Sequence, residues 1–283
     1  MVSRHDVLGT AVTMPVVIRD ACCFMAAYTA DVTAMRAAIT STATSEPRTP
    51  TPQSSAPSRH GTAQISSPAI NPVEIRRGRG IVILVFVDYR DGDLGPYNEF
   101  GVCFLLAPDD PDLPTRAPKR ATAARRWRSL LAGDTRALIH RLPVDGEFTL
   151  AAGRTIWGFP KTLADFDVNH DHRTRHGRVS QDGALIADLT VRPGIPARTT
   201  SLETTLHAYA RLDGVTRVTP WRLHKASGSH TRLGGARLEL GDHPIGQELR
   251  SLQLGKYALL TSSVDHLSMS FDDARPLTDV AAR

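Results

Sequence analysis

Lys161 lies in a stretch, residues 153–166, whose other members are mainly apolar. Pro160 directly precedes it, and Trp157 and Phe159 lie just upstream. Because burial disfavours the charged ammonium, a lysine held among such residues has a lowered pKa. Its neutral amine is a nucleophile that forms a Schiff base with a carbonyl compound. The alternative is that Lys161 extends its charged end from a strand to water.

Two further charged residues lie inside apolar stretches and could serve the same chemistry. Glu99 is embedded in Tyr-Asn-Glu-Phe-Gly-Val-Cys-Phe-Leu-Leu, and Arg19 in Val-Val-Ile-Arg-Asp-Ala. A buried carboxylate is unfavourable unless it is paired or functional. For both residues, the structural alternative is an ion pair with a residue of opposite charge.

The composition is that of a globular protein. Of 283 residues, 41% are hydrophobic and 22% are charged, and the formal net charge is +5. A chain of this length forms one large domain or two small ones and buries a full core. Much of the positive charge is arginine spread over loops, without any nucleic-acid-binding motif, so we expect no nucleic-acid partner.

We also expect no membrane partner. The longest purely apolar run, residues 81–87, is far too short to span a bilayer. Arg19 and Asp20 interrupt the N-terminal apolar stretch before any plausible signal-peptide cleavage site. The cysteines lack zinc-type spacing and are expected to be reduced thiols: Cys22, Cys23 and Cys103. These features predict a cytoplasmic protein of a size typical of enzymes.

A histidine-rich segment suggests metal binding at first sight. His170, His172 and His176 lie within seven residues. Asp171 and two arginines interleave them, and no partner cluster is evident in the sequence. A hairpin tip alone rarely supplies a closed coordination shell. We therefore predict no metal ligands, and no cofactor.

The rest of the chain shows patterns typical of β-strands. Strands are expected at residues 14–30, 81–89, 97–106, 137–144, 147–152, 184–191, 202–212, 215–223, 236–240, 257–262 and 266–271. Short helices are expected at 32–39, capped by Asp31, and at 245–251. Many short strands separated by turns predict a mainly β protein, built as an antiparallel closed barrel or a sandwich with a few short helices.

Two segments differ in composition from these elements. Residues 40–73 are rich in Pro, Ser and Thr and hold almost no large apolar residue. Such a segment cannot bury enough surface to offset the entropy of ordering it, so we expect a disordered insertion. Residues 107–134 are rich in proline and arginine, which is typical of a solvated surface or a partner patch.

Several of the stretches together resemble the acetoacetate decarboxylase superfamily. Gly-Phe-Pro-Lys at 158–161 resembles its Schiff-base lysine motif, and Gly-Pro-Tyr-Asn-Glu at 95–99 resembles its second site motif. The resemblance covers much of the chain outside 40–73 and 107–134. It implies one domain over residues 1–283, folded as a barrel-like antiparallel cone with a central cavity, and a homo-oligomer.

The resemblance also implies roles for individual residues. Lys161 would form the imine, Glu99 would move a proton beside the substrate, and Arg19 would contact the substrate carboxylate. The remaining residues expected to bind substrate are Tyr97, Arg154, Trp157 and Phe159. The implied reaction is the cofactor-independent decarboxylation of a short β-keto acid to a ketone and carbon dioxide, which makes the chain a carbon–carbon lyase.

Two positions depart from the pattern of the decarboxylase. Thr162 stands where the decarboxylase has a second lysine, and Leu84 falls near the place of a second carboxylate. Desolvation alone would then have to lower the pKa of Lys161. It can do so, since the pKa of a buried lysine shifts by up to about 3–5 units. The alternatives are an aldolase-dehydratase or cyclase that uses the same lysine, and a non-catalytic protein that binds small molecules.

Overall fold

The computed structural model describes residues 3–42, 70–107, 136–170, 172–197 and 204–277. Most of the insertion predicted at 40–73 lies outside these residues, as does most of the arginine-rich segment 107–134. At the margins of the insertion, helix α1 (Val32–Thr42) extends to Thr42, and Pro72 forms a bridge with Leu106. Asp31 caps α1 as expected, since its Oδ1 accepts a hydrogen bond from the Ala34 backbone at 2.9 Å.

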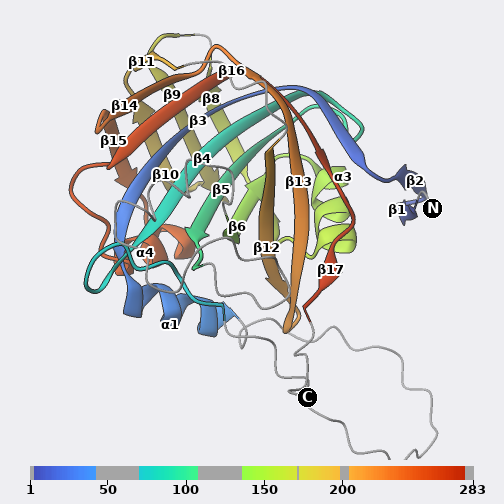
Figure 1. The fold of residues 1–283 in the computed structure, drawn as a ribbon, viewed down its shortest axis with the longest axis horizontal. Helices are drawn as coiled ribbons and strands as arrows, with labels where there is room; N and C mark the ends of the chain where they lie inside the picture. The colour runs from blue at the N-terminus through green and yellow to red at the C-terminus, as the bar shows by residue number, and fades with distance from the viewer. Residues whose placement is uncertain (1–2, 43–69, 108–135, 171, 198–203, 278–283) are drawn as a thin grey trace, which may run out of the picture.

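A closed barrel of seven strands organises the fold (Figure 1). In order around the ring these are β16 (Leu260–Phe271), β3 (Val16–Asp31), β4 (Arg79–Gly92), β5 (Tyr97–Leu105), β6 (Arg136–Val144), β12 (Thr204–Leu212) and β13 (Val215–Ser227). The barrel closes where β13 pairs with β16. The chain is thus mainly β, as the sequence predicts.

The barrel is mixed, so the expectation of a purely antiparallel sheet is wrong at two pairings. Strand β6 pairs in parallel with β12 and with the short strand β7 (Lys161–Leu163). Parallel neighbours require a crossover connection. The chain provides one between β6 and β7 through a helical segment, and another between β6 and β12 through a second sheet.

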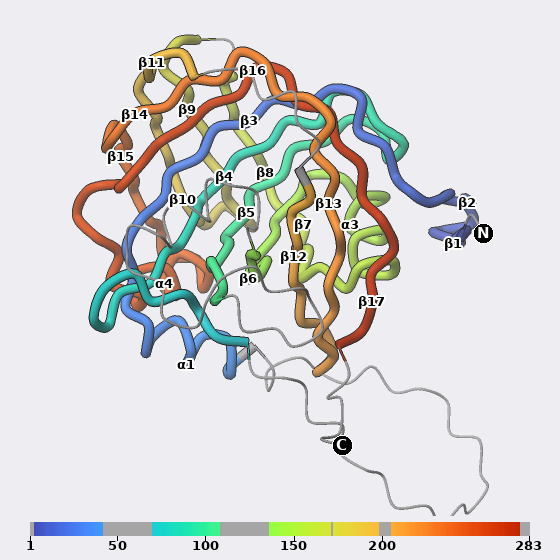
Figure 2. Tube along the Cα trace, viewed as in Figure 1, coloured from blue at the N-terminus to red at the C-terminus, as the bar shows by residue number. Residues whose placement is uncertain are grey.

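That second sheet has four strands, in the order β15 (Ala236–Leu240), β10 (Ala184–Val191), β9 (Arg175–Gln181) and β8 (Asp165–Asn169). Short strands extend the edges of the barrel: β11 (Ile195–Pro196), β14 (His230–Leu233) and β17 (Arg275–Pro276). Figure 2 shows the N-terminal hairpin of β1 (Arg4–Val7) and β2 (Thr10–Thr13) at one side of the molecule. No helix among the described residues is long and apolar enough to cross a membrane.

The barrel strands bury apolar side chains on both faces, because successive residues of a strand point to opposite sides. One face carries Phe24, Phe86 and Phe100, which pack with the second sheet, with α1 and with α4 (Pro244–Ser251). The other face carries Tyr89 and Tyr97, which pack with the hairpin β1–β2 and with the segment after β6. The predicted catalytic lysine belongs to this second side.

The segment after β6 is helical, so the strand expected at 147–152 is wrong. Helix α3 (Glu147–Ala152) continues directly into a π-helix, η1 (Gly153–Trp157). The Asp145 carboxylate accepts hydrogen bonds from the backbone and side-chain amides of Asn98, both at 2.8 Å, and Gly146 then caps the start of the helix. The helical repeat buries Thr149 and Ala152, three residues apart, on one face.

Candidate active site

Lys161 is held by the turn that joins η1 to β7. Gly158 ends η1 in the left-handed conformation with φ of 67°, which favours glycine. The chain then folds back, because the Phe159 amide donates to the Gly153 carbonyl at 3.0 Å and the Lys161 amide donates to the Phe159 carbonyl at 2.8 Å. Parallel pairing of Lys161 with Leu142 fixes the lysine beside β6.

The Lys161 amine is buried among polar and aromatic partners, and the residue is 3% exposed. Nζ lies 2.9 Å from Glu99 Oε2 and donates a hydrogen bond to Thr149 Oγ1 at 2.7 Å. It also lies 4.7 Å from the centroid of the Tyr97 ring, within cation–π range. Lys161 therefore does not extend to water, and the alternative of a solvated strand-end lysine is wrong.

Glu99 is brought to the amine by the hairpin of β4 and β5. The register pairs Tyr89 with Tyr97 and Val87 with Glu99, so Tyr89 and Glu99 are diagonal neighbours on one face. The Tyr89 hydroxyl donates to Glu99 Oε1 at 3.0 Å, and its ring stacks on Tyr97 at 4.3 Å between centroids. Glu99 is 6% exposed, and each of its oxygens has a partner.

Burial and charge act on the amine in opposite directions. Desolvation is the larger effect and lowers the pKa of Lys161 from its ordinary value. The Glu99 carboxylate opposes burial by its charge and its hydrogen bond, both of which raise the pKa of Lys161. Burial also raises the pKa of Tyr89 well above its ordinary value, so its hydroxyl stays protonated and can donate to Glu99.

Gly153 provides the space in which the lysine side chain lies. A Cβ atom added at Gly153 would lie 2.5 Å from Lys161 Cδ and 2.7 Å from Cε. Any larger residue there would displace the methylene chain that leads to Nζ. The glycine thus belongs to the site although it carries no functional group.

Three of the residues expected to bind substrate lie close to Lys161 in the chain. Arg154 Nη1 donates to the Lys161 carbonyl at 3.1 Å, so it supports the turn. Trp157 and Phe159 are buried and stacked at 5.7 Å between centroids, and Trp157 Nε1 donates to the Asp272 carbonyl at 2.9 Å. Both rings belong to the apolar cluster that also holds Tyr97. Their contact with a substrate stays a prediction.

Arg19 pairs with two carboxylates that are not part of this group. Its side chain is 49% exposed and pairs with Asp91 at 2.8 Å and with Asp93 at 2.7 Å. An ion pair of this kind is the structural alternative that the sequence offers to a role of Arg19 in substrate binding. To bind a substrate carboxylate, Arg19 would have to exchange these partners, so that role stays a prediction.

The position of Leu84 explains why no second acid is found there. Leu84 is fully buried in the apolar cluster with Phe86, on the face of β4 opposite to Tyr89. A carboxylate at this position would point away from Lys161. On the face of β4 that carries the site, the group that reaches Glu99 is the hydroxyl of Tyr89.

Sequence reasoning missed Tyr89, Thr149 and Gly153. Tyr89 could have been found by counting outward from the turn at residues 91–96, which places it opposite Tyr97. Thr149 contacts the amine because its segment is a helix, whereas the sequence pattern favoured a strand. Nothing in the sequence indicates the tight contact at Gly153.

Comparisons with known proteins agree with this fold and identify the family of the chain. The model of the acetoacetate decarboxylase (ADC) family matches residues 68–277, which include Glu99 and Lys161. No curated protein matches the chain.

Several solved structures share the fold at low sequence identity. An acetoacetate decarboxylase from Legionella pneumophila is 18% identical, with a TM-score of 0.58 over 95% of this chain and 89% of that chain. The enduracididine biosynthesis enzyme MppR, complexed with pyruvate, is 12% identical, with a TM-score of 0.55 over 93% and 90%. An acetoacetate decarboxylase-like enzyme from Sphingomonas wittichii is 11% identical, with a TM-score of 0.52 over 96% and 97%. Since the family model covers most of the chain, the protein belongs to the acetoacetate decarboxylase family.

Proposed function

We propose that this protein is a Schiff-base-forming lyase that decarboxylates a short β-keto acid without a cofactor. The observation that carries the proposal is the buried Lys161 amine, which lies 2.9 Å from the Glu99 carboxylate. A lysine in that position can be both a neutral nucleophile and the neighbour of a group that moves protons. Membership of the family supports the same chemistry.

The reaction begins when the neutral amine of Lys161 attacks the ketone carbon of the substrate. Loss of water from the carbinolamine gives a protonated imine, which is an electron sink β to the carboxylate. The carbon–carbon bond to the carboxylate then breaks and carbon dioxide leaves. The electron pair of that bond stays behind and neutralises the iminium, which gives an enamine. Protonation of the enamine carbon regenerates the iminium, and water releases the ketone and the free amine.

Glu99 supplies and removes the protons of these steps, since its Oε2 lies beside Nζ. Tyr89 orients Glu99 through the hydrogen bond to Oε1. Thr149 fixes the direction of Nζ, and the Tyr97 ring favours the positive charge of the iminium. In this scheme Tyr89 and Thr149 are positioning residues, and Lys161 and Glu99 are the catalytic ones.

A second candidate function is an aldol condensation and dehydration of a keto acid on the same lysine. Thr162 follows Lys161 in place of a second lysine, which favours a member other than the decarboxylase itself. MppR, which shares the fold, has been solved with the condensation product of pyruvate and imidazole 4-carboxaldehyde. In such a reaction the enamine on Lys161 attacks an aldehyde carbon instead of taking up a proton.

Turnover assays distinguish the two reactions. The protein is supplied with acetoacetate while carbon dioxide and acetone are measured, and separately with pyruvate plus an aldehyde while the condensation product is measured. We expect Lys161→Gln to lower whichever activity is present by about a thousandfold or more, because the nucleophile is lost. Lys256→Gln, which removes an exposed lysine, is the matched control and should retain full activity.

Ligand binding without any turnover, unchanged by Lys161→Gln, would overturn the proposal in favour of a binding protein. Homo-oligomeric assembly, a cytoplasmic location and a central cavity around Lys161 also remain predictions. The buried state of Lys161 and Glu99 means that substrate reaches the amine only after side chains around it move.

A further inference from the structure

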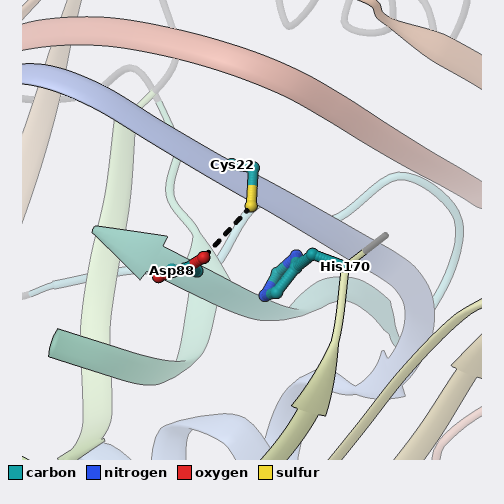
Figure 3. A group of neighbouring side chains, drawn as sticks. All are labelled: Cys22, Asp88 and His170. Carbon is teal, nitrogen blue, oxygen red and sulfur yellow. Dashed lines mark hydrogen bonds between the residues drawn. The ribbon is translucent and has the colours of Figure 1, made fainter. Parts of the chain in front are cut away.

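Three side chains that no catalytic step uses come together on the other face of the barrel (Figure 3). Cys22 of β3 and Asp88 of β4 occupy paired positions in the register of the two strands. His170 follows directly after β8 and reaches the same point from the second sheet. One ligand atom from each residue lies within 4.8 Å of the ligand atoms of the other two.

The donor set of this cluster is a thiol sulfur, an imidazole nitrogen and a carboxylate oxygen. Zinc is bound by these three groups at about 2.0–2.3 Å, and sites with three protein ligands keep a fourth position open. Ligand atoms of a tetrahedral site of that size are about 3–4 Å apart. The Cys22 thiol donates to Asp88 Oδ2 at 3.6 Å, which is already the spacing of two ligands of such a site. The His170 nitrogen lies within 4.8 Å of these atoms, so a shift of about 1 Å brings it to the same spacing.

A cavity of about 210 Å³ adjoins the cluster. It is lined by Cys22, Arg90, His170, Arg175, Asp265 and His266. Because two of the three candidate ligands line it, a metal held by them would have an open coordination position facing this space. Water or a small ligand could occupy that position.

The charges around the cavity are compatible with a divalent cation. Arg90 Nε donates to Asp88 Oδ2 at 3.0 Å, Arg175 pairs with Asp265, and His266 lies 3.0 Å from Asp20. The two arginines are therefore matched by carboxylates. Arg90 binds the same oxygen of Asp88 that accepts from the Cys22 thiol, and a carboxylate has several lone pairs. A metal can therefore take the place of the Cys22 proton beside Asp88 while Arg90 keeps its hydrogen bond to the carboxylate and orients it.

We propose that Cys22, Asp88 and His170 form a Zn²⁺ site that ties the end of β8 to strands β3 and β4. On binding, the Sγ–H bond of Cys22 breaks, the proton passes to solvent, and a bond between sulfur and zinc forms. The site is separate from the imine chemistry, since Cys22 and Asp88 point to the face opposite Cys23 and Tyr89. The sequence predicts no metal here because Cys22 and Asp88 are remote in the chain from the histidines.

The test is a titration of the metal-depleted, untagged protein with Co²⁺, which substitutes for Zn²⁺ and absorbs light when bound to thiolate. We expect one Co²⁺ per chain, with a sulfur-to-metal charge-transfer band that Zn²⁺ abolishes by displacement. Cys22→Ala should remove the band, and Asp88→Asn and His170→Ala should each weaken binding at least tenfold. The matched controls are Cys23→Ala and His172→Ala, which change neighbours outside the cluster and should bind as the unmodified chain does.

A second readout covers variants that fold poorly. Zn²⁺ should raise the melting temperature of the unmodified protein and of both controls, because a ligand that binds only the folded state stabilises it. The rise should be absent in Cys22→Ala and smaller than in the unmodified protein in Asp88→Asn and His170→Ala. Absence of Co²⁺ binding in the unmodified protein, or a charge-transfer band that persists in Cys22→Ala, would overturn the proposal.

Discussion

The reactivity of Lys161 depends on the balance between desolvation of its amine and the charge of Glu99. Desolvation lowers the pKa of Lys161, whereas the carboxylate at 2.9 Å raises it. A fully buried lysine without a counterion would be neutral but would lack a group to move protons. The Lys161–Glu99 pair keeps both properties. The pKa of the amine stays below its ordinary value, and the carboxylate lies within reach of Nζ.

This balance predicts the pH dependence of imine formation. The rate should rise with pH to a plateau. The midpoint of this rise should lie below about 10.4, the ordinary pKa of lysine. In Glu99→Gln the charge that favours the ammonium is gone, so the midpoint should move to still lower pH although the maximal rate falls. The measurement is the rate of reductive trapping of Lys161 across pH, with Glu239→Gln as a control at an exposed carboxylate. An upward shift of the midpoint in Glu99→Gln would contradict the prediction.

Gly153→Ala tests whether the lysine side chain needs the space that the glycine leaves. The added methyl would lie 2.5 Å from Lys161 Cδ, so we expect Nζ to move away from Glu99. Trapping should slow at least tenfold. The free energy of unfolding should fall by only about 1 kcal/mol, because the cost of overpacking is partly offset by the greater helix preference of alanine. Thr155→Ala, an exposed change in the same π-helix, is the control and should trap normally. Equal trapping rates in the two variants would show that Gly153 does not position the lysine.

At the scale of elements, the site depends on α3 and η1 as much as on the barrel. The sequence correctly predicts β3, β4, β5 and β6, because their apolar runs are long and bounded by turn residues. It fails at 147–152, because a run of this length is compatible with either a strand or a helix. The hydrogen bonds that precede the helix join Asp145 to Asn98 of β5, and a contact with a distant strand cannot be seen in the local sequence. The sequence predicts that Lys161 and Glu99 belong to one site. The contact between them depends on this helix, which leads into the turn that holds Lys161.

A partly buried cluster of Glu248, His140 and Arg141 joins α4 to β6 and predicts an acid-dependent stability. Glu248 lies 2.9 Å from His140 Nε2 and 2.8 Å from Arg141 Nε. Burial raises the pKa of Glu248, but the hydrogen bonds from His140 and Arg141 outweigh it and hold this pKa at about 2. Since the unfolded value is about 4.3, the stabilisation is full above that pH and is lost as the pH falls through about 2.

Glu248→Gln should therefore unfold at a lower urea concentration than the unmodified protein at pH 7. The difference between the two should shrink as the pH falls below about 4.3. Urea unfolding at a series of pH values measures this, and Glu239→Gln, at an exposed position of β15, is the matched control. If the difference were the same at pH 7 and near pH 2, the cluster would not have the role assigned to it.

At the scale of the whole molecule, the closed barrel brings together residues that are far apart in the chain. Glu99 and Lys161 come from strands on either side of β6, and Tyr89 joins them through the β4–β5 hairpin. The mainly β class and the family could be predicted from strand patterns and two short motifs. The closure of β13 on β16 could not be predicted, and neither could the meeting of Cys22, Asp88 and His170, because both depend on pairings between distant segments.

The most direct test of the account is chemical trapping of the imine on Lys161. The protein is incubated with acetoacetate or pyruvate, reduced with borohydride, digested, and mapped by mass spectrometry. The account predicts a stable adduct on the peptide that contains Lys161, and none on the peptide that contains the exposed Lys256. No adduct on Lys161 with any short keto acid, in a protein that remains folded, would contradict the central claim.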